Sequence, residues 1–282
     1  EAKGALLYLL AVFLLASMDA LSKDLSQRYD PLQVIWARYV GQSALVFALA
    51  APRLRTVLRT RFPRLQAARS ALMFGATICG FSAFAVMPLA EATAIFEVAP
   101  LLVTALAALL LGERVGPRRW TAVAAGFLGA LVIVRPGAGA FGPEALLPFG
   151  AAACYACYAI VTRHVGRDEG PWTALIYSAL FGSVAASVIV PFVWRPPSAS
   201  DAALMGLIGA VGASGHFCVI LAFRATAASI LAPFSYFGLI FATGYGLAWF
   251  GDAPDRWTVA GAAIIVGSGL YVWRRERRPE AA

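Results

Sequence analysis

Ten long segments of the chain contain no Asp, Glu, Lys or Arg. Each has at least 14 residues, and they cover residues 4–18, 39–52, 70–90, 98–112, 120–134, 145–162, 170–194, 202–223, 225–251 and 257–273. A helix that crosses a bilayer needs about 20 mostly apolar residues, and its backbone must satisfy its own hydrogen bonds. The pattern therefore predicts an all-α, polytopic membrane protein with ten transmembrane helices.

The composition excludes several other classes. Of 282 residues, 60% are hydrophobic and 13% are charged, whereas soluble domains are about 45–50% apolar and about 25% charged. Even a globule of about 300 residues buries only roughly 75% of its unfolded surface. A soluble enzyme, a nucleic-acid-binding domain and a disordered chain are therefore excluded, and the bilayer is an expected partner. Ten helices use roughly 200 residues, which leaves no room for a further domain.

Three predicted spans reach full length only by including a charge: Asp19 in span 1, Arg38 in span 2 and Glu97 in span 4. An isolated charge at bilayer depth costs about 2.5–3.5 kcal/mol. Asp19 and Arg38 are expected at similar depth. They form either a fixed ion pair that holds the first two helices together or a pair that lines or gates a pathway.

Glu97 and His216 are the other candidate polar groups of a binding site. Intramembrane carboxylates are functional candidates by default. Glu97 either meets a substrate amino group, carries a coupling proton or extends toward the membrane surface. His216 lies deep in span 8, where it either lines a pocket or forms a hydrogen bond to a neighbouring helix, and histidine titrates near neutral pH.

Aromatic side chains recur in the spans that carry these polar groups. Aromatic walls with a few convergent polar groups are typical of sites for small apolar and aromatic ligands. The alternative for any one of them is ordinary helix packing or lipid contact. The aromatic candidates for substrate binding are Phe81, Phe96, Tyr155, Tyr158, Phe217 and Tyr236.

The basic residues predict an orientation. With ten spans, 17 of the 23 Lys and Arg residues fall on the side of the two termini, five on the other side and Arg38 within a span. The five are Lys23, Arg28, Arg135, Arg195 and Arg256. Because basic loops stay in the cytoplasm, both termini are expected there.

The two halves of the chain resemble each other, which divides it into repeats at 1–140 and 141–282. Matching positions in the two halves are Asp30-Pro31 and Gly170-Pro171, Gly80 and Gly215, Gly112-Glu113 and Gly251-Asp252, and Trp120-Thr121 and Trp257-Thr258. Five spans per half give the second half the opposite orientation in the membrane. Inverted repeats of this kind are typical of transporters that work by alternating access.

These residues carry a resemblance to a known family. Ten spans in a 5+5 repeat, the glycine–acid pairs after spans 4 and 9, and the Trp that follows each resemble the EamA-type transporters of the drug/metabolite transporter superfamily. Within it the chain is most similar to exporters of aromatic and other neutral amino acids of the YddG type. The resemblance implies a secondary transporter or facilitator that exports neutral, especially aromatic, amino acids and related small metabolites across a bacterial inner membrane.

Other functions have less support in the sequence. An exporter of another metabolite or drug class is one alternative, and a lipid-acting membrane enzyme is another. The latter would need clustered His or carboxylates, yet the chain has two His. Cys154 and Cys157 lie in an apolar helix and are expected to be packing thiols rather than metal ligands. No metal site, cofactor or catalytic residue is predicted. Spans 5 and 10 are almost free of polar groups and are expected to face lipid or a second copy in a homodimer.

Overall fold

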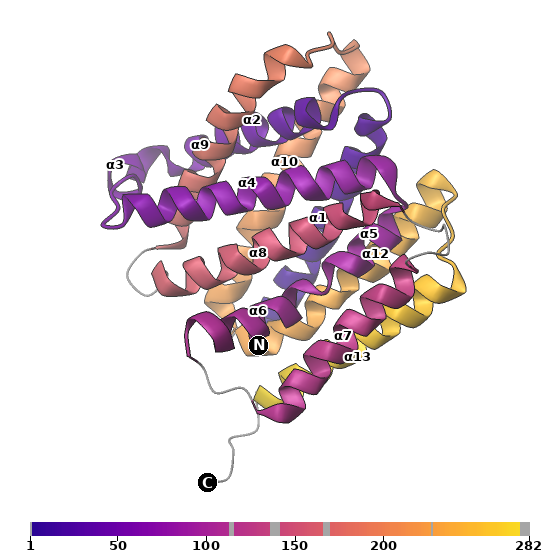
Figure 1. The fold of residues 1–282 in the computed structure, drawn as a ribbon. Coiled ribbons are helices and arrows are strands. Elements are labelled where there is room, and N and C mark those ends of the chain that lie inside the picture. The colour runs from indigo at the N-terminus through magenta and orange to yellow at the C-terminus, as the bar shows by residue number, and fades with distance from the viewer. Residues whose placement is uncertain (1, 113–115, 136–141, 166–169, 227, 277–282) are drawn as a thin grey trace.

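A computed structural model describes residues 2–112, 116–135, 142–165, 170–226 and 228–276 as a bundle of helices, and none of these residues forms a β-strand (Figure 1). Its long helices are α1 (Ala2–Ser26), α2 (Pro31–Ala50), α4 (Pro63–Val86), α7 (Pro117–Val134), α8 (Leu146–Val165), α9 (Pro171–Ile189), α10 (Ala199–Ala225) and α13 (Arg256–Glu276). Shorter elements are η1 (Ala51–Arg53), α3 (Leu54–Val57), α5 (Leu89–Phe96), α6 (Ala99–Leu110), η2 (Pro143–Ala145), η3 (Val190–Phe192), α11 (Ala228–Leu231), η4 (Ala232–Tyr236), α12 (Phe237–Tyr245) and η5 (Gly246–Phe250).

Within the described ranges, eight helical segments are long and apolar enough to cross a membrane. They include α5 and α6 together, as the segment Leu89–Leu110. The prediction of an all-α membrane protein is therefore confirmed. The predicted ninth span is divided among α11, η4, α12 and η5, and the predicted tenth lies in the 21-residue α13. Neither is among the eight, so the count of ten stays a prediction.

The fourth span differs from its prediction. It begins at Leu89, nine residues before the charge-free segment, and it includes Glu91. It is also not one continuous helix, because α5 ends at Phe96 and α6 begins at Ala99. Pro100 occupies the first turn of α6, where a missing N–H is tolerated. The predicted boundary between the two repeats falls at residues 140 and 141, outside the described residues.

Local sequence explains where the helices begin and end. Asp30 Oδ1 accepts from the Leu32 amide at 2.9 Å at the start of α2, and Ser198 Oγ accepts from the Asp201 amide at 3.1 Å at the start of α10. These are N-cap bonds that satisfy free amides. Pro begins four helices, as is common at the first helical position: Pro31, Pro63, Pro117 and Pro171.

Two glycines that were matched between the halves have the same backbone conformation. Gly112 follows α6 with a φ of 67°, and Gly251 follows η5 with a φ of 70°. Both lie in the left-handed region, which glycine adopts without the steric cost that a Cβ brings. The residue after Gly251 is Asp252, whereas Glu113, the residue after Gly112, lies outside the described residues. The matched glycines therefore end corresponding segments in the same way.

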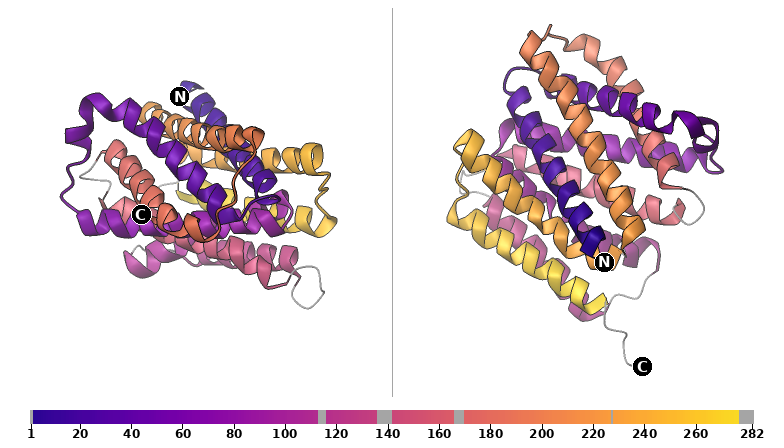
Figure 2. Two further views of the ribbon diagram at one scale, coloured as in Figure 1. Left: turned by 90° about the horizontal axis from the view of Figure 1, so that it is seen from above. Right: turned by 180° about the vertical axis from the view of Figure 1, so that it is seen from behind.

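The helices pack in matching pairs (Figures 1 and 2). Helix α1 runs along α10 as α8 runs along α4, α2 packs on α10 as α9 packs on α4, and α12 packs on α1 as α6 packs on α8. One set of contacts has no match in the described part of the chain. Helices α1 and α2 also pack against α4, whereas α8 and α9 lack comparable packing against α10. The bundle is therefore closed among α1, α2 and α4 and looser among α8, α9 and α10.

Close backbone contact between α2 and α10 depends on glycine. A Cβ on Gly209 would lie 2.6 Å from the Cα of Gly41, and a Cβ on Gly41 would lie 2.9 Å from the Cα of Gly209. Real Cβ atoms do not approach other atoms so closely, so these positions have no room for a larger residue. Small residues at helix crossings allow such close approach in membranes. The contact joins the middle of α2 to α10 next to the core of the bundle.

Helices α7 and α13 lie side by side at one flank of the bundle, magenta and yellow in Figure 1. Gly129 and Gly261 face each other at their crossing. Beyond the crossing, Arg135 at the end of α7 forms an ion pair of 2.7 Å with Asp255, which also accepts from the Thr258 amide at 2.7 Å. The Thr258 amide, with help from Arg135, holds the pKa of the Asp255 carboxyl below its usual value.

We predict that Gly261→Ala destabilises the protein and that Gly267→Ala does not. A Cβ on Gly261 would collide with the backbone oxygen of Gly129, whereas a Cβ on Gly267 meets no atom within 4 Å. Overpacking of this kind typically costs about 1–3 kcal/mol. Thermal unfolding of the two variants in detergent measures the difference. Equal melting temperatures would contradict the close contact of α7 and α13.

Candidate functional site

A cavity of about 300 Å³ lies among α2, α4, α8, α9 and α10. It occupies the region where α8 and α9 pack less against α10 than α1 and α2 pack against α4. Among the described residues, its lining contains no Asp or Glu. The lining residues are Arg38, Tyr39, Gln42, Gln66, Arg69, Met73, Tyr158, Thr162, Gly170, Ala174, Leu175, Ser178, His216, Val219, Ile220 and Phe223.

The cavity extends from the middle of the bundle toward one end. Arg38 lies in the middle of α2, whereas Gly170 immediately precedes α9 and Phe223 lies two residues before the end of α10. The starts of α4 and α9 and the ends of α8 and α10 lie at this end of the bundle, where α1 also begins (Figure 1). We call it the N-terminal end and the other the distal end.

Arg38 lies at the inner end of the cavity and is 4% exposed. Its Nη1 donates to Thr77 Oγ1 at 2.9 Å, its Nε to Met18 Sδ at 3.3 Å and its Nη2 to His216 Nε2 at 3.3 Å. The guanidinium also lies 4.7 Å from the ring centre of Tyr39. Each of these partners is uncharged. Thr77, Met18 and Tyr39 are neutral side chains, and His216 must be neutral at Nε2 because a guanidinium can only donate.

The predicted ion pair between Asp19 and Arg38 does not form. The two charges interact electrostatically, but no carboxylate of the described chain lies within 4 Å of the Arg38 guanidinium. Sequence position gave both residues a similar depth, but depth does not determine which way a side chain faces around its helix. Arg38 instead faces Thr77 on α4 and His216 on α10.

His216 lines the cavity, as one of the two alternatives predicted, and it also contacts a neighbouring helix, as the other predicted. Its Nε2 accepts from Arg38, which requires that nitrogen to be unprotonated. The ring is therefore neutral with its proton on Nδ1. A doubly protonated ring would lose this bond and place two cations side by side.

Thr77 holds the Arg38 side chain in place. Its hydroxyl donates to the Met73 carbonyl at 3.0 Å and accepts from Arg38 Nη1. Since its one proton is used, the contact of 3.0 Å to Tyr39 Oη is donated by Tyr39. Tyr39 is 1% exposed, so Thr77 joins two buried side chains of α2 to α4.

Arg69 is a cavity residue that the sequence analysis missed, because it was counted among the basic residues of the cytoplasmic side. It is 2% exposed, and its Nη2 donates to the Ala174 carbonyl and to Ser178 Oγ on α9. Its guanidinium lies 5.4 Å from the ring centre of Tyr158. The missed signal was spacing: Gln66, Arg69 and Met73 recur at helical intervals and line the same face of α4.

Glu97 lies at the break between α5 and α6 and is 9% exposed. The carboxylate interacts electrostatically with three tyrosines that converge from other elements: Tyr8 of α1, Tyr155 of α8 and Tyr236 of η4. The matching segment of the second half is also interrupted, since η4 separates α11 from α12. Glu97 does not line the cavity.

Aromatic contacts connect the surroundings of Glu97 to the cavity. The ring centres of Phe96 and Tyr155 are 5.6 Å apart, and those of Tyr155 and Tyr158 are 5.8 Å apart. Tyr158 lines the cavity, whereas Phe96, Tyr155 and Tyr236 do not.

The remaining aromatic candidates lie elsewhere. Phe81 is buried in an apolar cluster, with its ring centre 5.6 Å from the Arg38 guanidinium. Phe217 packs against Trp172 at 5.6 Å between ring centres and is not part of the lining. Of the ten predicted site residues, the cavity itself brings together Arg38, Tyr158 and His216.

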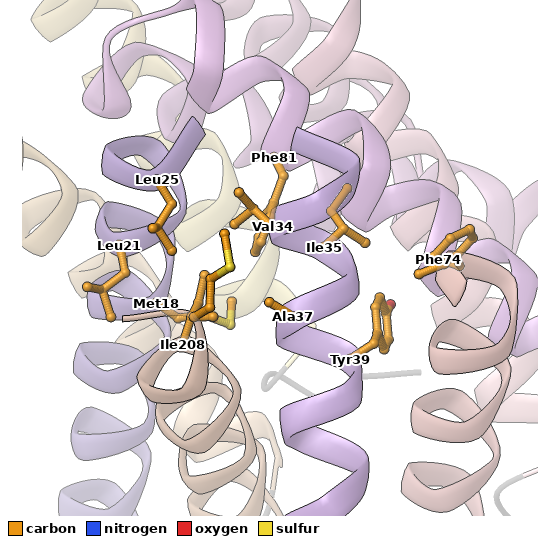
Figure 3. Close-up of a cluster of buried hydrophobic side chains, with 12 residues drawn as sticks. Met18, Leu21, Leu25, Val34, Ile35, Ala37, Tyr39, Phe74, Phe81 and Ile208 are labelled. Atoms are coloured by element: carbon orange, nitrogen blue, oxygen red, sulfur yellow. The ribbon is translucent and has the colours of Figure 1, made fainter. Parts of the chain in front are cut away.

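An apolar cluster closes the distal side of Arg38 (Figure 3). It contains side chains from α1, α2, α4, α9 and α10, which are buried against one another where the bundle is closed. Those of α1, α2, α4 and α10 that Figure 3 labels are Met18, Leu21, Leu25, Val34, Ile35, Ala37, Tyr39, Phe74, Phe81 and Ile208.

Polar contacts fasten the same helices at the distal end. Arg28 pairs with Asp24 at 2.7 Å and with Asp201 at 3.0 Å, and Tyr29 Oη donates to Asp201 at 2.8 Å. These contacts connect α1 and the following turn to α10. Lys23 of α1 donates to the Met87 carbonyl at 2.7 Å. The distal end is therefore closed by both apolar and polar contacts.

These features define a class of protein. An all-helical membrane protein with a polar cavity that is closed at one end and extends toward the other is built to move a small molecule across the bilayer. The chain belongs to the EamA-like transporter family, whose model matches residues 2–135 and 142–274. The family and its named members are membrane transporters rather than enzymes.

Curated relatives span the length of the chain. The S-adenosylmethionine uptake transporter of Rickettsia prowazekii is 26% identical over 98% of this chain and 94% of its own length. The riboflavin transporter of Rhizobium johnstonii is 30% identical over 85% and 81%. The pseudopaline exporter CntI of Pseudomonas aeruginosa is 28% identical over 97% of each.

A solved crystal structure supports the fold. It shares 22% sequence identity with this chain and aligns over 99% of this chain and 100% of its own, with a TM-score of 0.67. At this identity the likeness establishes the shared fold.

We predict that Thr77→Val destabilises the protein more than Thr77→Ser. Valine keeps the shape of the side chain but removes the oxygen that accepts from Arg38 and Tyr39, whereas serine keeps it. A buried donor left without its acceptor costs about 1–3 kcal/mol. Thermal unfolding in detergent compares the two variants with the native chain. Native stability in Thr77→Val would contradict the role of Thr77 in holding Arg38.

Proposed function

We propose that the protein is a secondary transporter or facilitator that exports neutral, especially aromatic, amino acids and related small metabolites across the inner membrane by alternating access. The observation that carries this proposal is the cavity, which is closed at the distal end and lined by guanidinium, imidazole, amide and aromatic groups. Its volume of about 300 Å³ is at the small end of the range of about 300–1,000 Å³ for ligand sites. That size favours a substrate of amino-acid dimensions.

We propose ten membrane spans in two inverted repeats of five, with the repeats at 1–140 and 141–282. The matching helix pairs support this arrangement, as do the left-handed glycines that end corresponding segments. Two separate matches to one family model, one in each half, add support. In this arrangement α13 is the tenth span, and the interrupted segment from α11 to η5 is the ninth.

We propose that the N-terminal end faces the cytoplasm of a bacterial cell and that both termini lie there. The excess of Lys and Arg on that side supports this orientation. The cavity then extends toward the cytoplasm, and the cluster at Phe81 separates it from the exterior. This is the state in which an exporter takes up its substrate.

The interrupted helices suggest where the amino group of the substrate binds. Discontinuous helices at matching positions of two repeats are typical of transporter binding sites. Glu97 lies at one interruption and Tyr236 at the other. We propose that Glu97 receives the substrate ammonium group at a second position on the pathway, outside the cavity that Arg38 lines, and that Tyr155, Tyr158, Tyr236 and Phe96 form the aromatic wall.

The same proposal assigns roles to three further residues that the sequence predicts to be part of the site. Phe81 and Phe217 contribute to the aromatic surroundings, and Asp19 acts as a gating charge near Arg38. The relatives named for S-adenosylmethionine, riboflavin and pseudopaline indicate that small metabolites of several classes are carried within this family. The direction differs among them as well, because one is an uptake transporter and another an exporter.

The outer face of α7 and α13 is apolar and exposed in the single chain. Exposed side chains on it are Trp120, Leu128, Leu131, Trp257, Val259, Ile264, Leu270 and Tyr271. We propose that lipid or a second copy of the chain in a homodimer covers this face. The mass of the protein solubilised in detergent distinguishes the two.

Reconstitution tests the transport proposal directly. Proteoliposomes containing the purified protein should take up radiolabelled phenylalanine, and other neutral amino acids, saturably and faster than empty vesicles. The measurement is made with and without an imposed proton gradient, which separates coupled transport from facilitated diffusion. Absence of flux above empty vesicles across a panel of amino acids would overturn the proposal.

We predict that Glu97→Gln lowers the flux of phenylalanine by about tenfold or more, because an ammonium group loses its charged acceptor. Glu144→Gln is the matched control, since Glu144 is an exposed residue of η2 outside the cavity. Flux is normalised to protein in the vesicles, so that expression does not enter the comparison. Native flux in Glu97→Gln would remove Glu97 from the site.

His216→Ala is predicted to lower flux as well, because it removes the acceptor that holds Arg38 Nη2. Retention of native transport by both His216→Ala and Glu97→Gln at every pH examined would show that the polar groups were assigned wrongly.

A further inference from the structure

Arg38 forms no ion pair with a carboxylate of the described protein, although Asp19 interacts with it electrostatically at longer range. It is 4% exposed, lies mid-helix in α2 and has no carboxylate within 4 Å. A lone charge at such a depth is unfavourable, and residues of this kind in membrane proteins mark substrate and ion pathways. Arg38 lines the cavity, so the missing negative charge can be supplied from there.

The hydrogen bonds of Arg38 leave part of the guanidinium free. A guanidinium has five N–H donors, one on Nε and two on each Nη. The hydrogen bonds to Met18, Thr77 and His216 use the Nε donor, one Nη1 donor and one Nη2 donor. One N–H on each terminal nitrogen therefore has no acceptor in the described protein. Guanidinium N–H groups of this kind can donate to the oxygens of a carboxylate.

The rest of the cavity favours the same chemistry. No acidic residue is among the described residues that line it, and a second buried guanidinium, that of Arg69, lies on its wall. The positive potential of a guanidinium in a poorly hydrated space attracts an anion. His216 accepts from Arg38 at a long 3.3 Å, so this contact can be exchanged for a shorter, charge-assisted one to an anion.

We propose that Arg38 binds the carboxylate of the transported molecule and that a carboxylate is required for recognition. The inference rests on the proposed transport of amino acids and adds the group that is read and the residue that reads it. Thr77 and Met18 position the guanidinium before the substrate arrives, and His216 occupies Nη2 in the empty cavity. Substrates whose carboxylate is masked as an amide are rejected, because the free donors and the charge then remain without a partner.

Binding of three related probes to the purified native protein tests the proposal. The probes are L-phenylalanine, L-phenylalaninamide, in which the carboxylate is masked, and 3-phenylpropanoate, which keeps the carboxylate but lacks the amine. We expect the amide to bind about tenfold or more weakly than phenylalanine, and 3-phenylpropanoate to retain measurable binding. Equal binding of phenylalanine and its amide by the native protein would overturn the inference, whatever the variants do.

Variants assign the effect to Arg38. Arg38→Gln should bind phenylalanine and its amide equally weakly, and Arg38→Lys should recover part of the preference, because it keeps the charge but not the paired donors. Arg256→Gln is the matched control, because Arg256 is exposed and lies over the Trp257 ring at 5.4 Å. An unchanged preference for the carboxylate in Arg38→Gln would also overturn the inference.

The two proposals fail differently. Transport of phenylalanine together with equal transport of its amide would leave the proposed function in place and exclude the role of Arg38. Arg38-dependent binding of 3-phenylpropanoate without transport of any amino acid would support the carboxylate site and exclude the proposed function. Binding of inorganic phosphate that depends on Arg38, with no binding of the carboxylate probes, would assign the guanidinium to a different anion and overturn the inference.

Discussion

A charged side chain inside a bilayer must obtain its partners from the protein itself, and the centre of this structure is arranged around one such charge. The guanidinium of Arg38 on α2 contacts Met18 of α1, Thr77 of α4 and His216 of α10. Four helices therefore meet at one side chain. Because its N–H groups have fixed directions, these contacts determine both how the helices converge and where the cavity ends.

The two interrupted helices solve a related problem. A continuous helix in lipid has all its backbone groups paired, so it presents side chains alone to a substrate. Between Phe96 and Ala99 the α-helix is interrupted, and over Ala232–Tyr236 the chain forms a 3₁₀-helix instead of an α-helix. Pro100 and Pro233 lie in these breaks, where an amide proton is least needed. The tyrosines around Glu97 surround one of these two places, where both backbone and side-chain groups can contact a substrate.

The helices could be predicted because charge-free length is a property of the sequence alone, and it identified the eight segments that are long and apolar enough to cross a membrane. The contacts between side chains of different helices could not be predicted from the sequence. Residue number gives the depth of Asp19 and Arg38, but the direction of each side chain depends on helix rotation, so their ion pair was predicted wrongly. Arg69 illustrates the same limit. Near a helix end, the sequence does not distinguish a basic residue that faces a cavity from one that faces water.

The unequal packing of the two halves determines what a transport cycle must break. If α8 and α9 close on α10 as α1 and α2 close on α4, the matching movement must separate the apolar cluster of Figure 3. Water or substrate then enters a space now filled by Met18, Leu21 and Phe81. The free energy of exposing those side chains is part of the barrier between the two states. The amino acids of this cluster therefore help to set the turnover rate through the free energy of exposing them, apart from any contact with the transported molecule.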